Sequence, residues 1–207
     1  MQVTKLLPLD KKRSRVWLDE EFAFVLYKGE LRRFNIREGG ELNEKDYIEI
    51  VHTLLPKRAK LRAMNLLKSH TYSVKQLEDK LREGFYPEEI ISEAIQYVSS
   101  YGYLDDLRLC EEYIRVHLAD KSRMRISMDL KRKGISSETI REAFENCSEE
   151  GFIQDETKQV KNLLKKRRFD PSLCNDRKEF AKQFSYLASK GYSSETIRKA
   201  LGEWDSF

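Results

Sequence analysis

The sequence predicts a mainly α-helical protein: an elongated solenoid of the right-handed type, with three tandem three-helix repeats after a small antiparallel β element and a helix. Two observations predict it. A twelve-residue segment occurs twice, as KGISSETIREAF from Lys133 and as KGYSSETIRKAL from Lys190, and a looser copy, GFYPEEI, begins at Gly84. The first glycines of the copies stand 50 residues (84 to 134) and 57 residues (134 to 191) apart. Such a period is typical of stacked helical repeats.

Each copy predicts a helix that ends at a glycine, a short turn, and a second helix with a capped start. Glycine stops a helix because it adopts the left-handed conformation without a Cβ penalty. Ser136 and Ser193 are the predicted N-caps. Pro87 aligns with the residue after these serines, the first helical position, where its missing N–H is harmless. Leu81 lies three residues before its glycine where the other copies have four, which predicts a middle helix one residue shorter in the first repeat.

Residues 1–35 differ from the rest and predict a small antiparallel sheet of two or three strands. Short β-favouring runs span residues 3–7, 15–18 and 22–27. Apolar residues in the last two runs alternate with a period of two, which places them on one face of a strand. These residues are Val16, Leu18, Phe22, Phe24 and Leu26. A sheet this small is expected to lean on the first helices.

Residues 36–56 are expected to form a connecting helix. Asn43 with Asp46 three residues later resembles a capped helix start, and Pro56 is expected to begin a new helix. Three repeats follow, at residues 57–105, 106–150 and 151–207. In the first repeat, helices are expected near residues 57–68, 74–83 and 87–99.

The segments that join the repeats are similar to each other. Each has a glycine, an aromatic residue, an aliphatic residue and an aspartate able to cap the next helix. We expect the aromatic residues, Tyr103 and Phe152, to be buried between repeats. An insertion at residues 169–177, containing Pro171, is expected to form a surface loop or an extra turn.

No catalytic or cofactor motif is found, and none of the three histidines has a metal-ligand spacing. We therefore expect no enzymatic activity, no cofactor and no metal. The adjacent Asp105 and Asp106 precede a helix, which favours capping over acid–base chemistry. Cys110, Cys147 and Cys174 are predicted to be free thiols in a reducing cytoplasm. No apolar run approaches membrane-spanning length, so we expect a soluble, cytoplasmic protein, monomeric by default.

Basic residues form clusters in a chain whose formal net charge is only +4. One interpretation is a solvated surface with cations near helix C-termini. The functional interpretation is a discontinuous basic strip that meets phosphates or an acidic protein surface. The candidate binding residues are Arg115, Arg123, Arg125, Lys131, Arg132, Lys133, Lys165, Lys166, Arg167 and Arg168.

Three-helix units also suggest helix-turn-helix DNA recognition, with Thr139 to Arg141 or Thr196 to Arg198 entering a groove. Ile140, Ala143 and Phe144 recur instead at packing spacing, and the side chains of a groove reader are not concentrated on one helix. Stacking of repeats explains three tandem units more simply.

Several segments together resemble the RecX family of recombinase regulators. They are the small N-terminal sheet, YGYLDDLR from Tyr101, KGIS from Lys133, and an end at Gly202-Glu203-Trp204. The resemblance covers nearly the whole chain and implies a cytoplasmic bacterial protein that binds the RecA recombinase. It implies binding along the groove of the RecA filament on single-stranded DNA, which limits filament growth, ATP hydrolysis, strand exchange and repressor cleavage. It implies no catalytic residue and no cofactor.

Two alternatives stay open at this point. The first is a helical-repeat protein that binds DNA directly and acts without RecA, and weak direct DNA binding could also accompany the RecA interaction. The second is a solenoid adaptor for another acidic protein.

Overall fold

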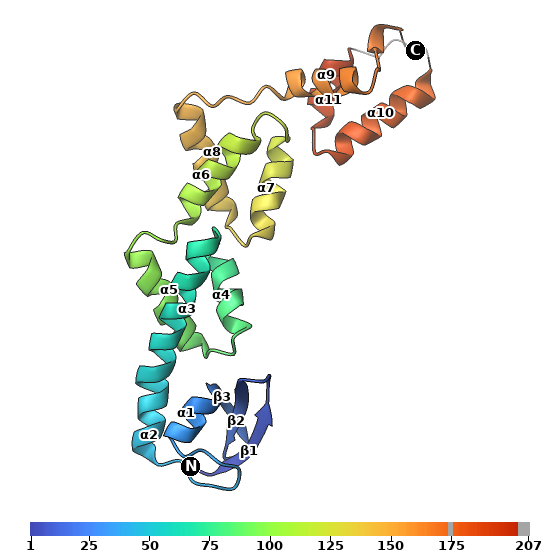
Figure 1. The fold of residues 1–207 in the computed structure, drawn as a ribbon. Coiled ribbons are helices and arrows are strands. Elements are labelled where there is room, and N and C mark those ends of the chain that lie inside the picture. Colours follow the sequence, from blue (N-terminus) through green and yellow to red (C-terminus); the bar gives the residue numbers. More distant parts are fainter. Residues whose placement is uncertain (174–175, 203–207) are drawn as a thin grey trace. The chain divides into compact units, whose positions relative to one another are not determined.

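The computed structural model describes residues 1–173 and 176–202, in two compact units, residues 1–105 and 106–207. We call them the N-terminal and C-terminal units (Figure 1). The elements of the N-terminal unit are β1 (Val3–Pro8), β2 (Arg13–Leu18), β3 (Glu21–Tyr27), α1 (Lys28–Arg33), α2 (Glu44–Glu49), the π-helix η1 (Ile50–Leu54), α3 (Leu55–Ser69), α4 (Val74–Arg82) and α5 (Glu88–Ser100). Those of the C-terminal unit are α6 (Asp106–His117), α7 (Arg123–Arg132), α8 (Ser137–Glu149), α9 (Glu156–Lys166), the 3-10 turn η2 (Pro171–Leu173), α10 (Arg177–Ser189) and α11 (Ser194–Leu201).

The predicted sheet is confirmed as three antiparallel strands in the order β1-β2-β3. Val16 and Phe24 pair across β2 and β3 and are buried, as the alternation predicts. Phe22 is 44% exposed, so the prediction that it shares one face with the buried Phe24 and Leu26 is wrong. The register shifts by one residue after the Val16–Phe24 pair, which places Phe22 opposite Trp17. This β-bulge moves Phe22 to the outer face of the sheet.

The sheet is attached to α3 by a partly buried arginine. Arg58 Nη1 lies 2.7 Å from the Glu30 carboxylate on α1, and Nη2 donates to the Val25 carbonyl at 2.6 Å. Its guanidinium also lies over the rings of Tyr27 and Tyr86. The sheet therefore leans on the first helices, as expected for so small an element.

The connection into the first repeat is one helical run rather than two helices. Asn43 caps α2 by accepting a hydrogen bond from the Asp46 N–H at 2.8 Å, as predicted. α3 begins at Leu55, one residue before Pro56, but it continues directly from η1. The Leu55 N–H donates to the Ile50 carbonyl, which closes the π-turn. A π-turn accommodates a proline that cannot donate to the preceding turn. Pro56 therefore does not break the helix.

Within the described residues, nine helices make up the three repeats, and in the first repeat their ends lie within two residues of the expected positions. Each repeat buries its own leucines and isoleucines, such as Leu77 and Leu81, Ile126 and Leu130, or Leu187 and Ile197. The predicted caps are confirmed, since Ser136 accepts from the Thr139 N–H and Ser193 from the Thr196 N–H, each at 3.0 Å.

The alignment of the first repeat at Gly84 is wrong by one residue. The left-handed residue is Phe85 (φ 63°), which corresponds to Gly134 (φ 84°) and Gly191 (φ 88°). In each repeat the N–H of this residue donates to the carbonyl three residues earlier at 2.9 Å. Leu81 then lies four residues before it, as in the other repeats, so the leucine spacing does not reflect a shortened helix. The assigned ends differ only slightly, since α4 ends three residues before this position, and α7 and α10 end two before theirs.

Two further assignments change with this register. Pro87 is the N-cap residue of α5, with φ −58° and ψ 151°, and not its first helical residue. Gly84 is needed because a larger residue would not fit: a Cβ there would lie 2.9 Å from both the Leu81 carbonyl and the Tyr86 ring.

The joints repeat in their backbone but not in their side-chain burial. Gly102 (φ 69°) and Gly151 (φ 91°) end α5 and α8 with the same hydrogen-bond pattern, and the N–H of the following aromatic residue reaches a carbonyl five residues earlier. Tyr103 and Phe152 are 57% and 43% exposed, so the prediction that they are buried between repeats is wrong. Leu104, the aliphatic residue of the first joint, is buried instead. Asp155 caps α9, as predicted.

Other predictions have mixed outcomes. The insertion forms η2, an extra turn, and burial raises the pKa of the free Cys110 thiol to about 12 and that of Cys147 above its usual value. Cys174, Glu203 and Trp204 lie outside the described residues. Within the described part of the chain, no helix is long and apolar enough to span a membrane, and no cluster of metal-ligating side chains occurs.

Candidate functional site

The loop between α6 and α7, residues 118–122, is joined to the third repeat by hydrogen bonds that form what we call the seam. Gln154 donates through Nε2 to the Lys121 carbonyl at 2.6 Å, and Gln159 donates through Nε2 to the Leu118 carbonyl. Both carbonyls lie in the loop after α6, where no helical hydrogen bond satisfies the backbone. Side chains of the third repeat therefore satisfy backbone acceptors of this loop.

The closest approach in the seam lies between the start of α7 and the end of α10. Ser122 caps α7 by accepting from the Arg125 N–H at 3.2 Å, and its Oγ donates to the Lys190 carbonyl at 2.8 Å. Gly191 follows, and a Cβ at this position would lie 2.6 Å from Ser122 Oγ. Gly191 is therefore required both for its left-handed backbone and for this contact.

Two adjoining pockets, of about 340 and 330 Å³, lie along the seam and share Asp120, Leu163 and Tyr192. We call them together the seam groove. Its cationic residues are Lys121, Arg125, Lys165, Lys166 and Lys190. Among the described residues that line it, Asp120 alone is acidic. Cations from the α6–α7 loop, α7, α9 and the end of α10 thus border one groove, which suits an anionic partner.

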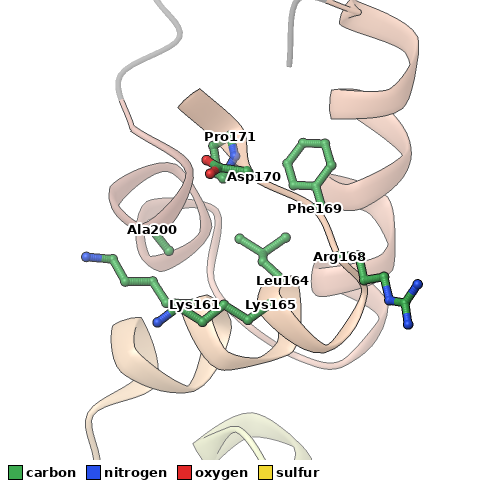
Figure 2. A pocket seen from close by; sticks show the side chains of 8 residues that line it. All are labelled: Lys161, Leu164, Lys165, Arg168, Phe169, Asp170, Pro171 and Ala200. Carbon is green, nitrogen blue, oxygen red and sulfur yellow. The ribbon is translucent and has the colours of Figure 1, made fainter. Parts of the chain in front are cut away.

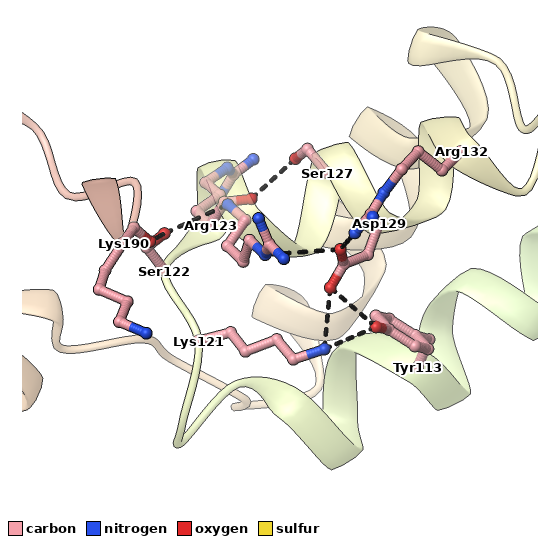
Figure 3. A network of polar contacts seen from close by, with 9 residues as sticks. Tyr113, Lys121, Ser122, Arg123, Ser127, Asp129, Arg132 and Lys190 are labelled. Carbon is pink, nitrogen blue, oxygen red and sulfur yellow. Dashed lines mark hydrogen bonds and ion pairs between the residues drawn. The ribbon is translucent and has the colours of Figure 1, made fainter. Parts of the chain in front are cut away.

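A buried carboxylate holds several of these cations in place (Figure 3). Asp129 on α7 lies 2.8 Å from Lys121 Nζ and 3.5 Å from Arg125 Nε, and it also pairs with Arg132. Tyr113 on α6 donates its hydroxyl to the same carboxylate at 3.1 Å. Burial raises the pKa of Asp129, but the hydrogen bonds from Lys121, Arg132 and Tyr113 outweigh it and hold the pKa well below its usual range. Asp129 therefore neutralises part of the groove's charge.

A separate pocket of about 480 Å³ lies between the end of α9, α11 and η2 (Figure 2). Leu164, Phe169, Pro171 and Ala200 supply apolar side chains to its lining. Its charged lining residues are Lys161, Lys165, Arg168 and the acidic Asp170. Lys165 lines both this pocket and the seam groove.

Comparison with known proteins identifies the three helical repeats. Residues 59–97, 105–143 and 154–201 match the models of the first, second and third three-helix domains of RecX. The regulatory protein RecX of Bacillus licheniformis is 30% identical over 198 residues, which cover 95% of this chain and 74% of that protein. The chain belongs to the RecX family. The regulatory protein RecX of Bacillus velezensis is 31% identical over 203 residues, covering 96% of this chain and 76% of that protein.

Solved structures agree on the RecX fold. A crystal structure of regulatory protein RecX is similar with a TM-score of 0.62 at 24% identity, over 96% of this chain and 98% of that one. RecX from Lactobacillus salivarius is similar with a TM-score of 0.58, over 74% of this chain and 98% of that one. At this identity the likeness establishes the fold alone.

The structure brings together only part of the basic set predicted from the sequence. Arg125, Lys165 and Lys166 border the seam groove. Arg167 lies beside it, with its guanidinium 4.1 Å from the centre of the Tyr186 ring. Arg168 lines the separate pocket. Their role in binding stays a prediction.

The other predicted residues lie elsewhere. Arg115 is paired with Glu150 at 2.6 Å and with Glu111, and Arg123 lies over the Phe144 ring at 4.1 Å. The remaining three, Lys131, Arg132 and Lys133, lie at or just past the end of α7, about 10 Å along the helix from Arg125 at 1.5 Å per residue. Arg132 is held there by Asp129.

Sequence reasoning missed two cations of the groove, Lys121 and Lys190. Lys121 lies in a loop, and nothing near it in the sequence shows that it approaches α7 and α10. Lys190 precedes the repeated glycine and matches Lys133, which was predicted. The repeat itself was the signal that could have found it.

We expect the C-terminal unit to lose stability as the pH falls below about 7. Burial and the nearby Lys121 lower the pKa of His117, whose ring lies 4.2 Å from that of Tyr113. In the unfolded chain His117 takes up a proton below about pH 6.5, whereas in the folded protein it does so only at a lower pH. The free energy of unfolding therefore rises with pH between these two pKa values.

Urea unfolding followed by circular dichroism at pH 7.5, 6.5 and 5.5 checks this expectation. His117→Phe keeps a ring against Tyr113 and cannot titrate, so its midpoint should change less over the same range. An equal change in both proteins would contradict the assignment.

Proposed function

We propose that this protein binds the RecA recombinase and its filament on single-stranded DNA, and that it limits filament growth. Less ATP hydrolysis, strand exchange and repressor cleavage would follow. Membership of the RecX family supports the partner. The observation that supports a contact surface is the seam groove, where cations from the α6–α7 loop, α7, α9 and the end of α10 converge.

The groove suits recognition of an extended anionic surface better than a small ligand. Its cations are spread over two repeats, and the seam hydrogen bonds keep those repeats in a fixed mutual position. Phosphates of the filament DNA and acidic side chains of RecA offer the complementary charge. Weak contacts at several places along one chain would add up through avidity.

Inhibition is proposed to act by occupancy. A protein seated along the filament would block the addition of RecA protomers and the conformational changes of those already present. No reaction by this chain is required. The proposal therefore predicts effects that scale with the fraction of filament covered.

Reversing the groove charge should weaken filament binding. We expect Lys165→Glu, Lys166→Glu and Lys190→Glu in one protein to lower affinity for the RecA filament about tenfold or more, equal to about 1.4 kcal/mol. The remaining binding should depend less on salt, because fewer ionic contacts are made. A matched control carries the same charge change on exposed lysines of the N-terminal unit: Lys28→Glu, Lys45→Glu and Lys68→Glu.

Fluorescence anisotropy with labelled single-stranded DNA, bare or coated with RecA and a slowly hydrolysed nucleotide, measures these affinities. Preference for coated DNA, together with falling RecA ATP hydrolysis, would support the proposal. Equal binding to bare DNA, with hydrolysis lost only when DNA is sequestered, would favour a direct DNA-binding protein that acts without RecA. Equal affinity of the groove variant and the parent would refute the groove assignment.

A further inference from the structure

One surface of the N-terminal unit, formed by the outer face of the sheet and the turn before α5, carries one exposed and two half-buried aromatic rings next to cations. We propose that this face binds single-stranded nucleic acid by base stacking. We call the surface the aromatic platform, and it consists of Lys5, Arg15, Trp17, Phe22 and Phe85. The inference goes beyond the proposed function because it concerns the other unit of the chain and requires no RecA.

The rings of the platform form a continuous series. Trp17 on β2 and Phe22 on β3 lie 5.5 Å apart edge to face, and Phe22 lies 6.3 Å from Phe85 in the turn before α5. Phe22 is 44% exposed and Trp17 is half-buried, although both belong to strands whose inner faces are buried. The bulge after Val16 is what places Phe22 on this face.

Phe85 is held in a backbone conformation that aromatic residues rarely adopt. Its φ is 63°, and the corresponding residues of the second and third repeats are Gly134 and Gly191. Left-handed backbone costs a non-glycine residue about 1–2 kcal/mol, and such strain often accompanies binding sites. The turn itself would be satisfied by glycine, so the ring is the feature that needs an explanation. It extends the platform beyond the sheet.

Cations accompany the rings. Lys5 Nζ lies 5.7 Å from the centre of the Trp17 ring, and the Arg15 guanidinium lies 4.7 Å from that of Phe85. Lys11 and Lys12 are exposed in the loop between β1 and β2. Glu20 and Glu21 are exposed at the opposite end of β2, in and beside its turn to β3. Phosphates are therefore expected to run on the lysine side of the rings.

This combination fits a single strand better than a duplex. Aromatic side chains stack on bases of any sequence, while nearby cations pair with the backbone phosphates. In a duplex the base faces are covered by their neighbours. A single strand therefore matches both features of the platform. Its unstacked bases can stack on the rings, and its phosphates can pair with Lys5 and Arg15.

Tryptophan fluorescence of the full chain tests the inference without RecA. Trp204→Phe leaves Trp17 as the sole tryptophan, since the sequence has two. Titration with a thymidine oligonucleotide should quench Trp17 emission to saturation, and a duplex of equal length should quench it much less. Phe22→Ala in this background should weaken the oligonucleotide affinity about tenfold, because stacking is worth about 1–3 kcal/mol per base.

Matched variants separate stacking from other effects. Phe152→Ala removes an aromatic residue of similar exposure from the C-terminal unit and should leave the Trp17 titration unchanged. Glu21→Gln should strengthen binding and Lys5→Gln should weaken it, both measurably at low salt. Circular dichroism checks that each variant is folded.

Three outcomes would overturn the proposal. Unchanged Trp17 emission at saturating oligonucleotide would show that the platform does not meet the bases. Equal quenching by duplex would exclude stacking. Quenching by RecA in the absence of DNA, with none by the oligonucleotide, would make the platform a protein-docking surface.

Discussion

Asp129→Asn is expected to destabilise the C-terminal unit by about 2 kcal/mol, because hydrogen bonds to charged groups are worth about 1.5–3 kcal/mol and this carboxylate accepts several. Its partners are Tyr113, Lys121, Arg125 and Arg132. The same change removes one negative charge from beside the seam groove. Affinity for the RecA filament should therefore rise two- to threefold at low salt, if the groove binds as proposed.

Urea unfolding and filament anisotropy measure the two effects separately. The stability difference between Asp129→Asn and the parent should shrink below about pH 4. The depressed pKa of Asp129 gives stability that is present above its unfolded pKa and is lost as pH falls towards the folded pKa.

Glu112→Gln is the matched control for Asp129→Asn. It makes the same charge change in an exposed pair with Arg108 on α6, so it should alter stability by less than about 0.5 kcal/mol. Equal effects of the two substitutions would mean that the Asp129 network does not support the fold.

Gly191→Ala is expected to destabilise the seam by about 3 kcal/mol. The left-handed backbone costs an alanine about 1–2 kcal/mol, and the added Cβ would lie 2.6 Å from Ser122 Oγ, an overlap that adds about 1–3 kcal/mol. Hydrogen exchange measured by mass spectrometry should show faster exchange at the start of α7 and the end of α10. Helices of the N-terminal unit should exchange as in the parent.

Gly151→Ala separates strain from overlap. Gly151 has a φ of 91°, but nothing lies within 4 Å of a Cβ placed there. Gly151→Ala should therefore lower the free energy of unfolding by only about 1–2 kcal/mol. Ser122→Gly removes the overlapping Oγ at a small capping cost, together with the hydrogen bond from that Oγ to the Lys190 carbonyl. The double variant Gly191→Ala with Ser122→Gly should be more stable than the sum of the two single effects predicts, because the overlap is gone. If the losses of unfolding free energy simply add, Cβ and Oγ do not contact each other directly.

Both predictions concern the seam because the function proposed above depends on the groove along it. The groove exists only while the α6–α7 loop, α9 and the end of α10 keep their positions. A Gly191→Ala protein that loses filament binding while its N-terminal unit stays intact would link the two properties. The Lys165, Lys166 and Lys190 variant, which changes charge and leaves the seam hydrogen bonds in place, shows whether the charge itself matters.

The helices, their caps and the family could be predicted from the sequence. Ser136 and Ser193 cap helices through atoms three residues away, and Gly134 and Gly191 stop helices through their own backbone conformation. Such interactions are local, so they repeat wherever the residues repeat. The positions of the strands followed equally from short runs of β-favouring residues.

Which side chains meet depends on the tertiary structure. The bulge that exposes Phe22 arises in the pairing of β2 with β3, and Phe85, which stands where the other repeats have glycine, contacts Phe22 and Arg15 of the sheet. Spacing along the chain reveals neither. The ten predicted cations are separated for the same reason: Glu150 and Asp129 neutralise Arg115 and Arg132, whereas Lys165 and Lys166 reach a groove completed by a loop and by Lys190. Charge on a sequence is a local property, but its pairing depends on how distant segments pack.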